Sequence, residues 1–231
     1  MTTLEQRLAE VRHRILQACE AAGRDPASVG LLAVSKLQPA QAVRQAWQAG
    51  QLAFGENYVQ EALDKMAELA DLRGATEWHL IGPLQSNKTR AVAEAFDWVH
   101  SVDRLKIAQR LSDQRPAQLP PLKVCLQVNI SGEASKSGVT PGELPALAHA
   151  VAALPGGRVR LRGLMAIPEP AAELQAQRAP HRALAALVHA LNAQGLALDT
   201  LSMGMSADLE AAVMEGSTLV RVGSAIFGAR A

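Results

Sequence analysis

Apolar side chains recur at helical spacing in the first stretch of the chain, and charged residues fill the positions between them. The apolar positions are Leu4, Leu8, Val11, Ile15 and Ala18. Gly23 follows as a helix stop signal, and Asp25-Pro26 then marks a turn. The pattern therefore predicts an amphipathic helix over residues 3–22.

After this helix, short apolar runs of strand length alternate with longer helical patterns. The predicted strands cover residues 30–34, 52–54, 78–81, 97–100, 122–130, 159–167, 198–201 and 218–222. The predicted helices cover residues 39–49, 57–72, 86–95, 103–114, 142–154, 171–194 and 206–215. Strands that alternate with helices indicate βαβ units and hence a parallel sheet.

Eight such strands favour an α/β fold of the (β/α)₈ barrel type, with the N-terminal helix as an additional element at the bottom of the barrel. A doubly wound open sheet is the alternative. No linker-like or low-complexity stretch divides the chain, so we expect residues 1–231 to form a single domain.

The composition narrows the possible functions. The chain has 231 residues, of which 48% are hydrophobic and 19% charged, as in an ordinary globular protein. Its two cysteines, Cys19 and Cys125, are too few for a metal cluster, so we expect no metal site and a reducing, cytoplasmic location. No apolar run reaches membrane-spanning length, and a net charge of +1 argues against nucleic acid as the main partner.

The first candidate for chemistry is a lysine at the end of the first predicted strand. A barrel carries its site at the C-terminal ends of its strands, and this strand runs into Val34-Ser35-Lys36. An amine at the barrel mouth is partly removed from water, which favours its neutral, nucleophilic form. Such an amine can form a Schiff base with an aldehyde. A solvated loop lysine explains the position equally well.

Other strand ends supply candidates for contacts with a ligand. Asn57 follows the second strand, where it serves equally well as a ligand contact or as the cap of the next helix. Met165 ends the sixth strand and suits packing against a flat ligand, although a core role is the default. His79 lies inside an apolar strand, where a hydrogen-bonded core histidine is more common than a catalyst.

Two Gly/Ser turns after the last two strands carry the strongest signal. The seventh strand runs into Ser202-Met203-Gly204-Met205-Ser206, and the eighth into Gly223-Ser224. Barrels often bind phosphate with the loops at these two places and the N-terminus of a short extra helix. Gly223 permits close approach of the backbone, while the hydroxyls of Ser202 and Ser224 add hydrogen-bond donors. We therefore predict a phosphate site here.

Lys36 and the phosphate site together indicate one ligand that carries an aldehyde and a phosphate. Pyridoxal 5′-phosphate (PLP) carries both groups on one ring. A phosphorylated sugar aldehyde also has both, and it would make the protein a Schiff-base aldolase. The residues alone leave these two ligands open.

Six segments spread over nearly the whole chain carry a family resemblance. They are Leu-Leu-Ala-Val-Ser-Lys (31–36), Phe-Gly-Glu-Asn-Tyr-Val-Gln-Glu (54–61), Trp-His-Leu-Ile-Gly-Pro-Leu-Gln-Ser-Asn-Lys (78–88), Gly-Leu-Met-Ala-Ile (163–167), Leu-Ser-Met-Gly-Met-Ser-Ala-Asp (201–208) and Val-Arg-Val-Gly-Ser-Ala-Ile-Phe-Gly-Ala-Arg (220–230). With them, the chain resembles the pyridoxal phosphate homeostasis protein family, single-domain relatives of the barrel domain of alanine racemase. In combination these motifs are highly specific.

The resemblance implies a role for each matching residue. Lys36 would hold PLP as an internal aldimine, and Arg221 would face the pyridine nitrogen. The phosphate would be held by Ser202, Gly223 and Ser224. The ring pocket would be lined by Asn57, Met165 and Met203.

The resemblance also implies storage and delivery of PLP without established turnover, with apo PLP-dependent enzymes as expected partners. Two-base racemisation needs a second acid/base group, and the only tyrosine is Tyr58. The alternative is an amino-acid racemase of the same fold that uses Lys36 as its base. Both a monomer and a weak dimer fit the sequence, and the polar loop 131–138 fits a flap, a docking surface or a plain surface loop.

Overall fold

Eight parallel strands close into a barrel within the part of the chain that the computed structural model describes, residues 2–133 and 137–228. The strands are β1 (Gly30–Val34), β2 (Ala53–Glu56), β3 (Glu77–Leu80), β4 (Trp98–Val102), β5 (Leu122–Gln127), β6 (Val159–Met165), β7 (Thr200–Ser202) and β8 (Leu219–Val222). Each strand pairs with the next along the chain, and β8 returns to pair with β1. The barrel prediction is confirmed, and the open-sheet alternative is wrong.

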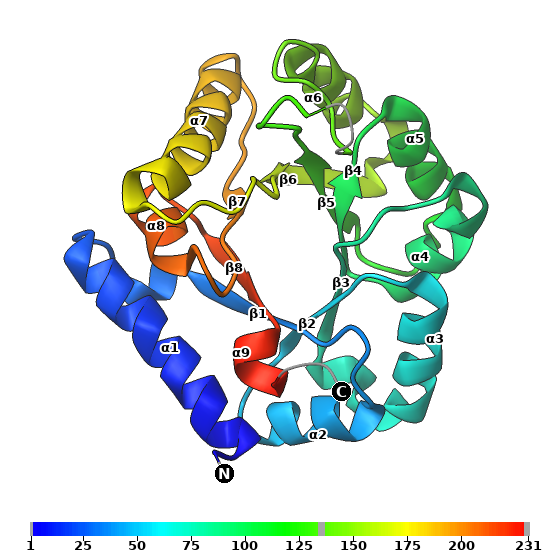
Figure 1. Ribbon diagram of the computed structural model, residues 1–231. Helices are drawn as coiled ribbons and strands as arrows, with labels where there is room; N and C mark the ends of the chain where they lie inside the picture. The colour runs from blue at the N-terminus through cyan, green and yellow to red at the C-terminus, as the bar shows by residue number, and fades with distance from the viewer. Residues whose placement is uncertain (1, 134–136, 229–231) are drawn as a thin grey trace.

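Helices surround the barrel in chain order (Figure 1). The α-helices are α1 (Leu4–Ala21), α2 (Ala40–Gln48), α3 (Val59–Glu68), α4 (Thr89–Ala95), α5 (Leu105–Gln114), α6 (Leu144–Ala152), α7 (Leu174–Ala193), α8 (Leu209–Met214) and α9 (Ser224–Phe227). Short 3₁₀ turns are η1 (Pro26–Ser28), η2 (Ala70–Ala75), η3 (Ser86–Lys88) and η4 (Pro155–Gly157). Connections of this kind place the C-terminal ends of all strands on one face of the barrel.

Several predicted boundaries are too wide, for local reasons. The predicted strand 122–130 ends at Gln127, and the next residue, Val128, pairs with Val139 in an isolated bridge. The predicted helix 206–215 begins only at Leu209, because Asp208 Oδ1 accepts a hydrogen bond from the Met205 N–H and holds the preceding residues in a turn. Part of the predicted loop 131–138, residues 134–136, lies outside the described residues.

The N-terminal helix stands in the outer ring, and the prediction that it lies at the bottom of the barrel is wrong (Figure 1). It packs against α2, α8 and α9. The helix that follows β8 has only four residues, too short to cover β8 and β1, and the apolar stripe of α1 fills that space with Leu8, Val11 and Ile15. Arg7 Nε donates to the Ile226 carbonyl over 2.6 Å and ties α1 to α9.

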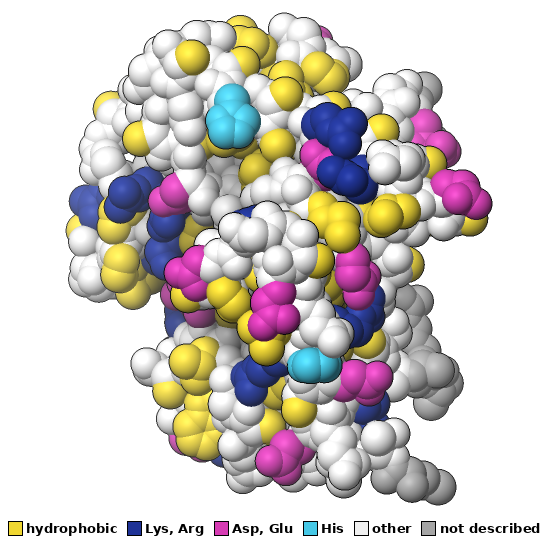
Figure 2. Space-filling view, turned by 90° about the vertical axis from the view of Figure 1, so that its left-hand side faces the viewer, with side chains coloured by type: hydrophobic (Ala, Val, Ile, Leu, Met, Phe, Trp, Pro, Cys, Tyr) yellow, Lys and Arg dark blue, Asp and Glu magenta, His cyan; other side chains and the backbone are white. Residues whose placement is uncertain are grey.

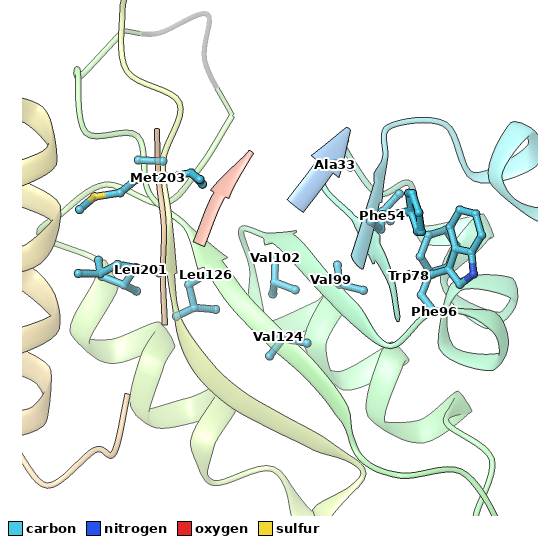
Figure 3. Packing of buried hydrophobic residues seen from close by; sticks show 14 of the residues in the cluster. Ala33, Phe54, Trp78, Phe96, Val99, Val102, Val124, Leu126, Leu201 and Met203 are labelled. Atoms are coloured by element: carbon cyan, nitrogen blue, oxygen red, sulfur yellow. The ribbon is translucent and has the colours of Figure 1, made fainter. Parts of the chain in front are cut away.

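Aromatic packing outside the barrel fixes the end of β2. Phe54 on β2 and Trp78 on β3 lie side by side with their ring centroids 5.7 Å apart, and both are fully buried. Figure 3 shows Phe96 beside them and Leu201 and Met203 on the far side of the barrel. Because Phe54 lies three residues before Asn57, this packing holds the start of the β2–α3 connection at the C-terminal face.

The surface carries charges of both signs. On the face with α1, α7 and α8, basic and acidic side chains are interspersed (Figure 2). Arg14 on α1 pairs with Glu210 on α8 over 2.8 Å, and Arg178 on α7 pairs with Glu215 over 2.6 Å. This face therefore has no continuous basic patch of the kind that nucleic-acid binding requires. Each helix in the described ranges is too short or too polar to cross a lipid bilayer.

Candidate functional site

A cavity of about 310 Å³ opens at the C-terminal ends of the strands, where a barrel of this type carries its site. Its walls come from residues at or just after the ends of β1, β2, β3, β6, β7 and β8. The lining residues are Val34, Lys36, Gln38, Asn57, Ile81, Ile167, Met205, Ser206, Ala207, Arg221, Gly223, Ser224, Phe227 and Gly228. Five of the eight predicted site residues are among them: Lys36, Asn57, Arg221, Gly223 and Ser224.

Two side chains of α3 hydrogen-bond to the turn that carries Lys36, one on each side of the lysine. Leu37 adopts a φ of +60°, in the left-handed region that non-glycine residues rarely enter. Its N–H donates to Glu61 Oε1 over 2.5 Å. On the other side, Lys65 Nζ donates to the Ser35 carbonyl over 2.8 Å. These two bonds hold the turn in a conformation that brings Lys36, itself half-buried, to the cavity wall.

A buried ion pair lies behind this turn. Lys65 Nζ is 2.6 Å from Glu56 Oε1, and their side chains are 4% and 0% exposed. Ser35 Oγ also donates to Glu56 Oε1, over 2.6 Å. Burial raises the pKa of Glu56, while the charge and hydrogen bond of Lys65 act in the opposite direction. Since Ser35 and Glu56 immediately precede Lys36 and Asn57, the pair fixes the ends of two strands that form the cavity.

Asn57 lines the cavity and does not cap α3. The residue at the N-terminal cap is Tyr58, and no side chain caps that end. Gly82 packs against the Asn57 backbone so closely that a Cβ there would lie 2.2 Å from the Asn57 carbonyl oxygen. Asn57 Oδ1 is buried and has no hydrogen-bond partner among the described residues. A buried acceptor of this kind is costly, which favours the ligand-contact interpretation.

The two Gly/Ser turns meet at one side of the cavity. The turn after β7 contributes Met205, Ser206 and Ala207, and the turn after β8 contributes Gly223 and Ser224. A Cβ on Gly223 would lie 3.1 Å from the Val34 carbonyl oxygen, so glycine allows the close approach of β8 to β1 here. Hydroxyl and backbone donors from two adjacent turns suit an oxyanion.

Arg221 adds a positive charge to the cavity although it is only 4% exposed. Its Nη1 donates to the carbonyl and, over 2.8 Å, to the hydroxyl of Ser202, and its Nη2 donates to the Ala166 carbonyl over 2.9 Å. Burial lowers the pKa of Arg221 to about 10, so the guanidinium stays protonated near neutral pH. It is therefore a fixed cationic donor.

Three predicted site residues lie outside the cavity lining. Ser202 is fully buried, with its hydroxyl bound to Arg221 and His100. Met165 packs with Trp98 and Cys125, as the default core role predicts, and Met203 belongs to the main core. Their place as ligand contacts stays a prediction, and Ser202 reaches the cavity only through Arg221.

Several cavity residues are absent from the sequence predictions. Ser206 had a usable signal, since it ends the same Gly/Ser turn as Ser202 and carries the same hydroxyl. Gln38 lies two residues beyond Lys36, but nothing in its pattern separates it from a loop glutamine. The apolar residues that contact the cavity are indistinguishable in sequence from core residues. They are Val34, Ile81, Ile167, Met205, Ala207 and Phe227.

Known proteins match the chain over its full length. The family model for the alanine racemase N-terminal domain matches residues 7–231. The pyridoxal phosphate homeostasis protein of Pseudomonas aeruginosa is 66% identical over 230 residues, which are 100% of this chain and 97% of that protein. The chain belongs to the pyridoxal phosphate homeostasis protein family. The member from Escherichia coli K12 is 56% identical over 232 residues, covering 100% of this chain and 98% of that protein.

Solved structures of known proteins share the fold. PipY of Synechococcus elongatus without PLP superposes with a TM-score of 0.86 at 41% identity, covering 98% of this chain and 100% of PipY. PipY with PLP bound gives a TM-score of 0.84 at 40% identity over the same shares. Alanine racemase of Corynebacterium glutamicum, at 20% identity and a TM-score of 0.64, shares the barrel fold, which covers 95% of this chain and 61% of that enzyme.

Proposed function

We propose that this protein binds pyridoxal 5′-phosphate in the cavity at the C-terminal face, covalently through Lys36, and takes part in storing and delivering the cofactor inside the cell. The observation that carries the proposal is one cavity bordered by a lysine, a cationic arginine and two Gly/Ser turns. Its volume of about 310 Å³ suits a small ligand. The PLP-bound structure of PipY, 40% identical to this chain, supports the choice of ligand.

Each end of the ligand has a partner of suitable chemistry. The neutral amine of Lys36, having lost a proton to solvent, bonds to the aldehyde carbon, and the aldehyde oxygen leaves as water. Gly223 and Ser224 bind the phosphate, joined by Ser206 from the neighbouring turn. Arg221 donates to the pyridine nitrogen, and Asn57 offers its unpartnered Oδ1 at the ring. When bound in this way, the cofactor supplies a C=N carbon that stays open to exchange with other amines.

The composition of the cavity supports holding the cofactor without turnover. Among the described lining residues there is no histidine, tyrosine, cysteine or carboxylate, so Lys36 is the group that can exchange a proton at reacting atoms. Tyr58 is 54% exposed and lies outside the lining. Loss of a positioned acid/base group typically costs about 10²–10⁴ in rate. A protein with this cavity binds the cofactor and releases it to apo-enzymes without racemising amino acids.

Titration with PLP and with pyridoxal tests the proposal. The wild-type protein should develop the visible absorption band of a Schiff base with PLP, and Lys36→Ala should lose it while Lys88→Ala retains it. Pyridoxal, which lacks the phosphate, should bind at least about tenfold more weakly. The double variant Ser206→Ala with Ser224→Ala should reduce the difference in affinity between PLP and pyridoxal. Equal bands in Lys36→Ala and the wild type would overturn the covalent assignment.

Exchange of the Cα hydrogen of alanine in D₂O tests the absence of turnover. The loaded protein should exchange it no faster than free PLP at the same concentration. Steady exchange that Lys36→Ala abolishes would show that Lys36 acts as a catalytic base at Cα and contradict this part of the proposal.

A further inference from the structure

A chain of hydrogen bonds crosses the barrel interior from the cavity to the opposite face. It starts at Arg221, whose Nη1 is 2.8 Å from Ser202 Oγ. Ser202 Oγ is 2.8 Å from His100 Nδ1, and His100 Nε2 is 2.9 Å from His79 Nδ1. The chain ends at Glu77, with 3.3 Å between His79 Nε2 and Glu77 Oε2. Residues from β3, β4, β7 and β8 therefore form one connected path.

The middle of this path is sealed from water. His79 is 1% exposed, and His100 and Ser202 are 0% exposed. The indole of Trp98 stacks on the His79 ring at 5.4 Å and 9°. Burial lowers the pKa of His79 and, more strongly, that of His100, for which the positive charge of Arg221 adds to the effect. Both imidazoles are therefore neutral near pH 7.

The far end of the path is anchored by a paired carboxylate. Glu77 Oε1 accepts hydrogen bonds from Lys123 Nζ at 2.6 Å and from Trp98 Nε1 at 2.9 Å. Although burial opposes ionisation, the bonds from His79 and Lys123 hold the pKa of Glu77 far below its usual range. Glu77 is thus a permanent acceptor near neutral pH.

The two end groups fix every proton between them. Glu77 accepts only, so His79 carries its proton on Nε2 and accepts at Nδ1. His100 must then donate from Nε2, which leaves its Nδ1 as an acceptor for the Ser202 hydroxyl. At the other end, Arg221 has no acceptor and donates to Ser202 Oγ. All hydrogen bonds of the path therefore donate in the same direction, from Arg221 towards Glu77. Ser202 donates its single hydroxyl proton in a hydrogen bond to His100.

We propose that His100 and His79 are positioning residues that orient the Ser202 hydroxyl and thereby hold the Arg221 guanidinium at the cavity. Ser202 accordingly acts through Arg221 and not on a phosphate. The nearest negative charge along the path, Glu77, lies four hydrogen bonds away and is neutralised by Lys123. The groups that accept hydrogen bonds from Arg221 are thus neutral, and Asp208, a carboxylate that acts on Arg221 through its charge, is itself paired with His181 over 2.8 Å. The donors of Arg221 therefore remain available to a ligand acceptor.

Nitrogen chemical shifts of histidine test the proton assignment on the unmodified protein. In ¹⁵N-histidine-labelled protein near pH 7, two imidazoles should be neutral with the proton on Nε2. Their assignment to His79 and His100 comes from the loss of each signal in His79→Gln and His100→Gln. An imidazolium, or a proton on Nδ1, at either residue would overturn the proposal. This readout needs no ligand, so it is independent of the proposed function.

Variants of His100 test the positioning role, which rests on the proposed function for its ligand. Glutamine offers an acceptor and a donor in the same order as the neutral imidazole, whereas leucine offers neither. PLP should therefore bind to His100→Gln within about threefold of the wild type and to His100→Leu at least about tenfold more weakly. The exposed His189→Gln is the matched control.

The outcomes of the binding assay are distinct. Equal affinity of folded His100→Leu and His100→Gln would overturn the positioning role. If His100→Leu does not fold, His79→Leu against His79→Gln makes the same comparison one step farther along the path. Failure of the wild type to bind PLP would refute the proposed function. The proton assignment would still be tested by the nitrogen chemical shifts, which need no ligand.

Discussion

Replacing Lys65 with methionine removes the positive charge from the buried ion pair behind the Lys36 turn. Lys65 donates to the Ser35 carbonyl at 2.8 Å, to Glu56 at 2.6 Å and to Glu61 at 3.1 Å. Glu56 is 0% exposed, and its Oε2 already lacks a hydrogen-bond partner among the described residues. The variant would leave its carboxylate buried without a counter-charge. Removal of one partner from a buried pair typically costs about 3–5 kcal/mol, and we expect that loss in the free energy of unfolding.

Urea unfolding followed by circular dichroism measures this loss. The double variant Glu56→Gln with Lys65→Met removes both charges, so it should be more stable than Lys65→Met alone. Lys106→Met, an exposed lysine on α5, should change the free energy by less than about 0.5 kcal/mol. A loss below about 1 kcal/mol for Lys65→Met, or a double variant no more stable than the single one, would refute this account of the pair.

Three further predictions follow from buried groups. Burial keeps His79 and His100 neutral, so the unfolded chain binds more protons below pH ~6.5. The free energy of unfolding should therefore decrease with falling pH, by about 1.4 kcal/mol per pH unit for each imidazole, and His100→Gln should show a shallower slope in urea titrations. Gly82→Ala places a Cβ 2.2 Å from the Asn57 carbonyl oxygen, and it should weaken PLP binding measured by titration, whereas Gly74→Ala, with open space around it, should not. Burial raises the pKa of Cys125 to about 12, so iodoacetamide should label it at pH 8 only after unfolding; rapid labelling of the native protein would contradict this.

The strand order and several residues of the cavity were predictable because they depend on local rules. Alternating apolar runs and helical patterns predicted the barrel, and the barrel assigned function to the residues at strand ends. Lys36, Gly223 and Ser224 follow directly from that logic, and the structure brings all three to one cavity. The family motifs added the role of Arg221, which position alone does not reveal.

The supporting contacts were not predictable because they join residues far apart in sequence. Glu56 and Lys65 read as ordinary charged residues until the fold places both under the Lys36 turn. Ser202 reads as a free hydroxyl donor, yet its hydroxyl is hydrogen-bonded to His100, 102 residues away in the sequence. The position of α1 depends on the short length of α9. Sequence patterns do not define where such a helix ends.

A single lysine, Lys36, should hold the cofactor in the cavity, and borohydride trapping identifies that lysine. The protein is incubated with PLP, reduced with sodium borohydride and digested, and the peptides are analysed by mass spectrometry. We expect a pyridoxyl group on the peptide that contains Lys36, at close to one per chain. A modification spread over Lys88, Lys106 and other lysines, or its absence from Lys36, would overturn the assignment of Lys36.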